Sequence, residues 1–414
     1  MVGLYLNDNL LVDLPPEIGQ LRNLMTLALH NNRLLNVPKE LGKCAKLQNL
    51  SLSNNKLTEV PLEIGDCSDL KTLEVRENAS LITPPPAMVD QGPGAVADYF
   101  LRFGRARTDR KLDLSKLSLR AFPAEAARAG AGLLLEQLDL SDNTLGTLPY
   151  AICALEALES LRLVRCRLAG RLTQGLGELT GLTELRLDNN DIEALPVGLG
   201  RCTGLTRLSL EHNAPLRLPP RVVALRGPPH PARFLALVSD AEATGRLALP
   251  GLELVTTDFL EVAVCSRRVA VVHDPPPLPG GPWDHVTVLD LSQNRLPALS
   301  EALGAMTALV ALLCHRNRLT RLPDSTTRLG ALRHVRLDDN QYADFPAVAC
   351  FADAGEHVDQ EQTFGMDVSA LGVRATTRVW VHGAFRSGLE SIDISDNLLR
   401  TLHKALVRLA SLQV

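Results

Sequence analysis

The residue types that could perform catalytic or metal chemistry are scattered along this chain. Its 414 residues include ten histidines and eight cysteines, without a CxxC pair or an HExxH segment. Zinc sites and nucleophilic centres need such ligands or bases at short, defined spacings. Segments of the GxSxG type and of the phosphate-binding GxxxxGK(S/T) type are absent as well. We therefore predict a non-enzymatic protein with no catalytic residues, no metal site, no cofactor and no small-molecule substrate.

Acidic side chains and cysteines recur at fixed places instead. Asp139 and Asp290 occupy the same place in the similar segments LDLSDN and LDLSQN. A carboxylate repeated in this way is typical of a solvated face rather than of an acid–base pair. Cys44, Cys67 and Cys202 lie in the matching contexts GKCAKL, GDCSDL and GRCTGL, which favours small buried residues with free thiols over a redox role. These recurrences indicate an internal repeat.

The repeat is 23 residues long and rich in leucine. LMTLALHNN begins at Leu24, LQNLSLSNN at Leu47 and LKTLEVREN at Leu70. The frame extends back to Met1 and returns at Leu135, Leu158, Leu182, Leu205, Val286, Leu309, Leu332 and Leu389. The leucines of each L-x-L segment point to one side of a short strand, so we expect coils that bury their leucines only against neighbouring coils.

Asparagine recurs at the ninth position of the repeat, and Cys166 replaces it in one coil. The asparagines are Asn9, Asn32, Asn55, Asn143, Asn190, Asn213, Asn294, Asn317, Asn340 and Asn397. At the turn after a strand this side chain would be buried, and a buried amide needs hydrogen-bond partners. We expect backbone groups of adjacent coils to supply them, which makes these residues structural.

The second half of each coil begins with proline. LPPEIGQL at 14–21 and VPKELGKC at 37–44 are two examples, and they predict one short helical or 3₁₀ turn on the outer side of the coil. The whole pattern, L-x-x-L-x-L-x-x-N/C-x-L, resembles the leucine-rich-repeat proteins, and its LPxxIGxLxxL half is similar to their Ras group. The resemblance implies the α/β class: a curved leucine-rich-repeat solenoid with parallel strands on its concave face and short helical or 3₁₀ turns on its convex face.

Two longer segments interrupt the repeats and are similar to each other. One begins at Asn78 and the other at Asn213, with Tyr99 matching Phe234, and a weaker third copy begins at Asn340. Their pattern NxxLxxPPxxxxxxGxxAVxxYFL resembles the stretch that closes the repeat array of Roco proteins, where a P-loop GTPase follows. Here leucine-rich coils follow instead.

These interrupting segments have an apolar face. The first carries Val96, Tyr99, Phe100 and Leu101 on helical spacing. That spacing predicts a short helix covering the open side of the preceding coils. We expect these side chains to pack in the core rather than to form an exposed docking site.

The interruptions divide one continuous solenoid into four sub-arrays. We place them at 1–104, 105–242, 243–362 and 363–414, with the last one incomplete. A stretch rich in proline and glycine at 265–285 predicts a loop inserted in the third sub-array. Arg267, Arg268 and Trp283 would suit an interaction loop, while a tolerated insertion is the simpler interpretation.

Composition and charge exclude several partners. A net charge of −4 gives no general attraction to nucleic acid or to anionic lipid. No apolar run approaches the ~18 residues of a membrane span, and the start of the chain lacks the features of a signal peptide. A cytoplasmic location is therefore the expectation. The chain starts at the first position of a coil and ends three residues into another, so we also expect a fragment or an incomplete gene model.

Residues on the solvent side of the strands are the candidates for partner binding. Arg162, Arg186 and Arg207 lie at such positions in consecutive coils, with strands ~4.8 Å apart. Guanidinium groups pair with carboxylates in two-point fashion, so these arginines predict an acidic partner surface. The alternative is a solvated face on which Glu184 and Asp188 neutralise the arginines. The candidate set for protein binding is Arg162, Arg165, Arg186, Arg207, Glu211, His212, His315, Arg316, His334 and Arg336.

These observations bear on three functional classes. The first is a non-enzymatic scaffold or recognition module that binds a protein on its strand face, with a role in intracellular signal transduction. By family analogy the resemblance implies a small Ras-like GTPase as partner. The second is the regulatory repeat region of a larger Roco-type GTPase or kinase whose catalytic domain lies outside this sequence. An extracellular receptor is disfavoured because signal peptide and cysteine-rich caps are lacking.

Overall fold

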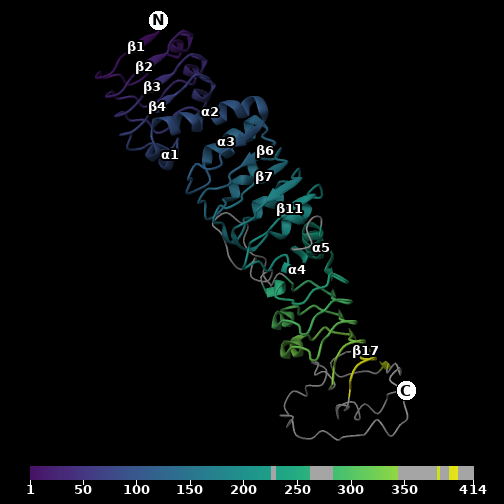
Figure 1. Ribbon diagram of the computed structural model, residues 1–414. Coiled ribbons are helices and arrows are strands. Elements are labelled where there is room, and N and C mark those ends of the chain that lie inside the picture. The colour runs from purple at the N-terminus through teal and green to yellow at the C-terminus, as the bar shows by residue number, and fades with distance from the viewer. Residues whose placement is uncertain (225–229, 262–282, 344–379, 383–390, 400–414) are drawn as a thin grey trace, which may run out of the picture. The chain divides into compact units, whose positions relative to one another are not determined.

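The computed structural model describes residues 1–224, 230–261, 283–343, 380–382 and 391–399 (Figure 1). They fall into two compact units. Unit one comprises residues 1–192 and 204–214, and unit two comprises the other described residues. The third interrupting segment and most of the fourth sub-array lie outside the described residues, and the division into four sub-arrays stays a prediction.

Unit one contains two parallel sheets of very short strands, several of which are labelled in Figure 1. The first is β1 (Gly3–Tyr5), β2 (Thr26–Ala28), β3 (Asn49–Ser51) and β4 (Thr72–Glu74). The second is β5 (Lys111–Asp113), β6 (Gln137–Asp139), β7 (Ser160–Arg162), β9 (Glu184–Arg186) and β11 (Arg207–Ser209). Two further strands, β8 (Ala169–Arg171) and β10 (Asp191–Ala194), lie elsewhere in their coils. The predicted frame is confirmed, because leucines pair with leucines along each sheet: Leu27 is in register with Leu50, and Leu161 with Leu185.

The second half of each coil forms the predicted 3₁₀ turn. In unit one these turns are η1 (Pro16–Gln20), η2 (Lys39–Lys43), η3 (Leu62–Asp66), η4 (Tyr150–Ala154) and η5 (Gln174–Glu178). Proline stands just before or at the start of most of them, where its missing N–H costs nothing. The glycine within the turn allows close stacking. A Cβ atom on Gly42 would lie 2.1 Å from the backbone oxygen of Glu63 in the next turn.

The ninth-position asparagines form the predicted ladder of buried amides. Asn55 is 7% exposed, and its Nδ2 donates to the backbone oxygens of Leu29 and Leu52 at 3.0 and 2.9 Å. Its Oδ1 accepts from the backbone N–H of Leu34 at 3.0 Å, so one side chain joins two coils. Cys166 takes this place in its coil and directs its thiol at the backbone oxygen of Leu140 at 3.2 Å.

The first interrupting segment forms helices, as predicted, but the main one is longer than a short cover. The segment contains α1 (Pro86–Gln91) and α2 (Pro93–Asp109), and α3 (Ala124–Leu133) replaces a 3₁₀ turn in the next coil. Val96, Tyr99 and Phe100 are buried on α2 against η3, whereas Leu101 is only half-buried. The helix approaches η3 closely, because a Cβ atom on Gly104 would lie 2.0 Å from the backbone oxygen of Gly65.

Unit two repeats this arrangement. Its helices are α4 (Arg221–Ala224) and α5 (His230–Thr244), and its 3₁₀ turns are η6 (Val197–Arg201), η7 (Glu301–Ala305) and η8 (Asp324–Arg328). Its parallel strands are β12 (Arg246–Ala248), β13 (Val288–Asp290), β14 (Ala311–Leu313), β15 (His334–Arg336) and β17 (Ser391–Asp393). The sequence pattern did not predict β16 (Trp380–His382), which pairs with β17 in antiparallel fashion.

The prediction that 265–285 forms a loop projecting from the solenoid is wrong at Trp283. Its side chain is 2% exposed, and its Nε1 donates to the backbone oxygen of Leu260 at 3.3 Å. A buried indole with a satisfied N–H is a core residue, so Trp283 does not belong to an interaction surface. Residues 265–282 of this segment, with Arg267 and Arg268, lie outside the described residues.

Candidate protein-binding surface

The candidate arginines of unit one lie on three neighbouring strands, as expected. Arg162 on β7 is in register with Arg186 on β9, so their Cβ atoms project from the same side of the sheet. Arg207 on β11 lies one row away, in register with Glu184. The side chains of Arg162 and Arg186 are 44% and 47% exposed, and Arg207 is exposed as well. We call these three residues the arginine face.

Glu184 lies at the centre of the arginine face. It was expected to face solvent, but it is buried, as is Ser160 beside it, because the two guanidinium groups cover them. Its Oε1 accepts from Arg186 Nε at 2.6 Å, and its Oε2 accepts from Ser160 Oγ at 3.0 Å. Arg162 Nη2 lies 3.5 Å from the same Oε2. One buried carboxylate therefore holds two arginines.

The surroundings of Glu184 favour the ionised form of its carboxyl group. Burial by itself raises the pKa of this carboxyl group. The hydrogen bonds from Arg186 and Ser160 and the positive charge of Arg162 outweigh burial, so the pKa is lowered from its ordinary value. The part of the alternative hypothesis that concerns Glu184 is confirmed: it neutralises one positive charge of the arginine face.

Asp188 does not neutralise the arginines, so that part of the alternative is wrong. Its Oδ1 accepts from the backbone N–H of Glu211 at 2.8 Å and from the hydroxyl of Ser209. These bonds fix the turn after β11, and no ion pair joins Asp188 to an arginine in the described part of the chain. Within the described residues Arg207 has no ion-pair partner, so it adds an uncompensated positive charge to the face.

Three further candidates lie at the turns that follow these strands. Arg165 is exposed, but it already has an ion-pair partner, because its Nε and Nη2 bind the two carboxylate oxygens of Asp142 at 2.5 and 3.1 Å. This pairing lowers the pKa of Asp142, chiefly through the hydrogen bond from Arg165. Asp142 was missed as a partner, although it lies one repeat before Arg165. Glu211 and His212 are exposed next to Arg207.

The second candidate patch lies in unit two, on β14, β15 and the turns after them. Arg336 binds Asp338 through two hydrogen bonds at 2.8 and 3.3 Å, so most of its charge is compensated. Arg316 is exposed and lies 3.8 Å from Asp339. His315 is half-buried, and burial together with the charge of Arg336 lowers its pKa, while His334 is exposed. This patch is thus more neutral than the arginine face.

The first sheet of unit one presents a mostly neutral face, as the sequence predicted. Thr72 Oγ1 donates to Asn49 Oδ1 at 2.9 Å, and Ser51 Oγ lies 3.3 Å from His30 Nδ1. Tyr5 is 70% exposed at the edge of this sheet. Because these groups bond one another along the sheet, they offer no cluster of charge to a partner.

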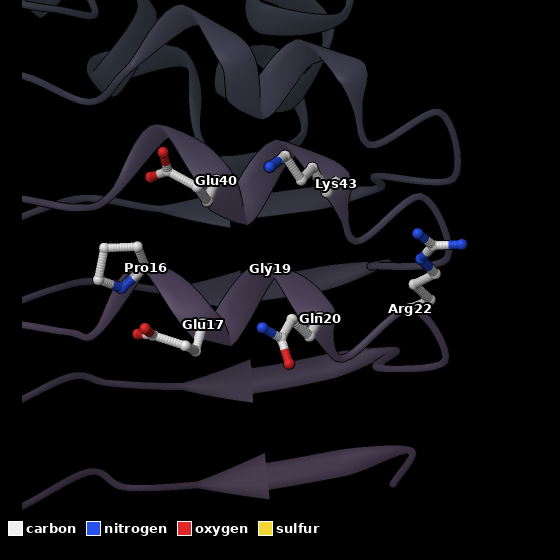
Figure 2. A pocket seen from close by; sticks show the side chains of 7 residues that line it. All are labelled: Pro16, Glu17, Gly19, Gln20, Arg22, Glu40 and Lys43. Atoms are coloured by element: carbon white, nitrogen blue, oxygen red, sulfur yellow. The ribbon is translucent and has the colours of Figure 1, made fainter.

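A small pocket lies on the outer side of the first two 3₁₀ turns. Glu17 and Gln20 of η1, Glu40 and Lys43 of η2, and Arg22 line it (Figure 2). The labelled side chains project into solvent around Gly19, whose Cβ would lie 2.2 Å from the backbone oxygen of Glu40. The pocket follows from the close stacking of two turns.

The described residues contain little that could act as a reactive centre. No group of three or more His, Cys, Asp or Glu side chains in them is arranged to hold a metal ion. Burial raises the pKa of the Cys67 and Cys166 thiols to about 12, so these groups are not thiolates at neutral pH. Across the same residues, the model contains no helix with the length and apolar character of a membrane span.

Comparison with known proteins agrees with this architecture. A family model described as Leucine rich repeat matches residues 2–57 and 22–79, and a second model of the same description matches residues 134–155. Similar solved structures include a leucine-rich-repeat protein of Leptospira interrogans, at 22% identity, covering 100% of this chain and 77% of that chain, with a TM-score of 0.25.

Two other similar structures have stated biological contexts. One is an internalin of Listeria monocytogenes, at 15% identity, 83% and 82% coverage and a TM-score of 0.25. The other is a plant peptide hormone receptor solved in complex with RGF2, at 22% identity and a TM-score of 0.23. The match with the receptor covers 82% of this chain and 40% of the receptor chain. The sequence frame, the parallel register and the family models together show that this chain has an α/β leucine-rich-repeat solenoid fold.

Proposed function

We propose that the chain is a non-enzymatic protein-interaction module that binds an acidic surface of a protein partner through the arginine face. The observation that carries this proposal is the geometry around Glu184. Two arginines share one buried carboxylate, and a third, Arg207, stands beside it without compensation. The three arginines and Glu184 together carry a net charge of +2 in a chain whose total charge is −4, while Asp139 on β6 is in register with Arg162 and Glu211 follows β11.

The arrangement suits the recognition of carboxylates. A guanidinium group has five N–H donors, and Glu184 engages only Nε of Arg186 and Nη2 of Arg162. The outer N–H groups of both arginines are left for a partner, and their orientation is already restrained. Restraint before binding reduces the side-chain entropy that association would otherwise cost. An acidic partner segment would therefore meet a preformed set of donors.

The finer assignments rest on the resemblance of the LPxxIGxLxxL repeats to the Ras group. We propose a cytoplasmic role in signal transduction, with a small Ras-like GTPase as the partner that the resemblance implies. The other hypothesis, a regulatory region of a Roco-type GTPase or kinase, rests on the NxxLxxPP segments alone. Sequencing of the complete transcript tests it, because a downstream P-loop or kinase core would favour it.

The arginine face is tested by neutral substitution. The triple variant Arg162→Gln, Arg186→Gln and Arg207→Gln removes the donors without placing new carboxylates near Glu184. The partner is first identified by capture on the immobilised chain and then purified, and its Kd is measured at two salt concentrations. We expect the triple variant to raise the Kd about tenfold or more and to lose most of the salt dependence.

A matched control changes three exposed arginines away from the strand face. Arg22, Arg105 and Arg120 are exposed in unit one, and their replacement by glutamine changes the net charge by the same amount. The control variant should keep the Kd within about twofold, because long-range attraction alone is screened by salt. Equal loss in both variants, or loss in neither, would overturn the assignment of the site.

A further inference from the structure

The two units contain the same helical junction, built twice from different side chains. The first junction consists of η3, α2 and the start of α3, and the second consists of η6, α5 and the turn that begins at Asp258. Corresponding hydrogen bonds recur 135 residues apart. Val60 N donates to Thr83 O at 2.9 Å, and Leu195 N donates to Leu218 O at the same distance. The fold of one junction is therefore an internal reference for the other.

Three buried positions differ in polarity between the junctions. The first junction has Thr83, Tyr99 and Glu125, which are 2%, 0% and 3% exposed. The second has Leu218, Phe234 and Leu260 at the corresponding positions, each 1% exposed. Because the second junction forms with apolar side chains, the fold itself does not require the polar trio. Buried polar groups cost stability unless they are fully paired, so the trio calls for another explanation.

The polar trio is not fully paired. Tyr99 donates its hydroxyl hydrogen to Glu125 Oε1 at 2.7 Å. Thr83 Oγ1 has no hydrogen-bond partner in the described part of the chain. Among the same residues, no lysine, arginine or histidine forms a direct ion pair with Glu125, because the nearby Arg128 pairs with Glu59 instead.

Two of the trio, Thr83 and Glu125, line a pocket of about 570 Å³ between η3, α2 and α3. Thr83 and Glu125 share its wall with the apolar side chains of Val60, Leu62 and Phe103. Two charged pairs lie at its rim: Arg107 is 3.3 Å from Glu63, and Arg128 is 3.5 Å from Glu59, while Lys39 forms no ion pair with a described residue. A volume of this size suits a small ligand or one long side chain.

We propose that this pocket binds an alkyl primary ammonium group, with the ammonium on Glu125 and Thr83 and the aliphatic part against Val60, Leu62 and Phe103. The ammonium supplies the direct ion-pair partner that Glu125 lacks, and its three N–H donors suit a carboxylate and a hydroxyl oxygen. The ligand is either a small free amine or a lysine side chain of a protein. This site is separate from the arginine face and does not rest on the proposed function.

The proposal makes binding dependent on pH. Burial raises the pKa of Glu125, against the opposing effects of the hydrogen bond from Tyr99 and the charge of Arg128, while Glu59 adds to the rise. Lys39, Glu63 and Arg107 complete the charged groups around the pocket. An ammonium ligand favours the ionised carboxylate. Its affinity should therefore fall as the pH drops through the pKa of Glu125 in the free protein.

The test is titration of the 414-residue chain with n-pentylammonium, with 1-pentanol as the uncharged probe and N-acetyl-lysine methylamide as the mimic of a lysine side chain. We expect n-pentylammonium to bind at least about tenfold more tightly than 1-pentanol, because only the cation pairs with Glu125. If the lysine mimic binds as tightly as the free amine, a protein lysine is the ligand, and if only the free amine binds, a small amine is. Binding of neither cation would overturn the proposal.

Variants of the first junction make the test specific. Glu125→Gln should weaken n-pentylammonium binding about tenfold or more, whereas Glu63→Gln at the rim should change it less than about twofold. The triple variant Thr83→Leu, Tyr99→Phe and Glu125→Leu copies the second junction and is therefore expected to fold, with binding lost. Retention of full affinity by the triple variant, with folding shown by circular dichroism, would refute the site.

Discussion

Replacement of Asn190 by leucine tests whether the asparagine ladder holds the coils together. Asn190 is 4% exposed, and leucine has the same branching at Cγ, so the change removes hydrogen bonds with little change in shape. The Asn190 Oδ1 accepts from the backbone N–H groups of Cys166 and Leu168, both at 3.0 Å. Its Nδ2 donates to the backbone oxygens of Leu163 and Leu187, both at 2.8 Å.

The number of orphaned groups sets the expected cost. Leu187 O also accepts from Asn213 Nδ2 at 3.0 Å, so it stays paired in the variant. Cys166 N–H, Leu168 N–H and Leu163 O would lose their partner, and each buried unsatisfied group costs about 1–3 kcal/mol. Partial relaxation of the backbone brings the expected destabilisation to about 3–5 kcal/mol, in the range of strongly disruptive core changes.

Amide hydrogen exchange measures this effect at the bonds concerned. A loss of about 3 kcal/mol corresponds to exchange more than about 100-fold faster at Cys166 and Leu168, since each 1.4 kcal/mol is a factor of ten. The control is Asn189→Gly, at an exposed neighbour whose φ is 57°, which should change stability by less than about 1 kcal/mol. Unchanged protection of Cys166 and Leu168 in the leucine variant would show that the ladder is not a stability determinant.

Four further outcomes are expected. Leu185→Ala should lower the unfolding free energy by about 2–5 kcal/mol, because the Leu185 side chain is fully buried. Arg186→Ala should lower it far less when both variants are unfolded in denaturant. An equal loss in the two variants would contradict the assigned frame. Cys166→Asn should stabilise the chain by about 1 kcal/mol, because it restores an amide to the ladder, and an unchanged or lower unfolding midpoint would count against this reasoning. The folded-state pKa of Glu125 is raised, so the stability it contributes is present below its ordinary pKa and is lost as the pH rises through the folded-state pKa. Glu125→Gln should therefore flatten the pH dependence of the unfolding midpoint, and an unchanged profile would contradict the assignment. Thiol titration under denaturing, non-reducing conditions should find all eight cysteines free, whereas several disulfides would favour an exported protein.

The repeat frame could be predicted from the sequence because it follows from local periodicity. Leucines at alternating positions select one face of a short strand, and proline with a glycine four residues on selects a 3₁₀ turn. The buried role of Asn55 also followed, since an amide at a fixed turn position must bond backbone groups of adjacent coils. In each case the determining partners lie in the same coil or in the adjacent one.

The tertiary structure decided which charged residues neutralise each other and which buried groups stay unpaired. The repeat pattern places both Glu184, on β9, and Asp188, just after β9, on the solvent side, yet Glu184 pairs with arginines and Asp188 binds the turn after β11. Side-chain reach and burial separate them, and neither is encoded in the spacing. Likewise Tyr99 and Glu125 are 26 residues apart, and only the packing of α2 against α3 places the hydroxyl 2.7 Å from the carboxylate. Periodicity determines where a side chain faces, whereas the balance of desolvation and pairing depends on neighbours that only the folded chain brings together.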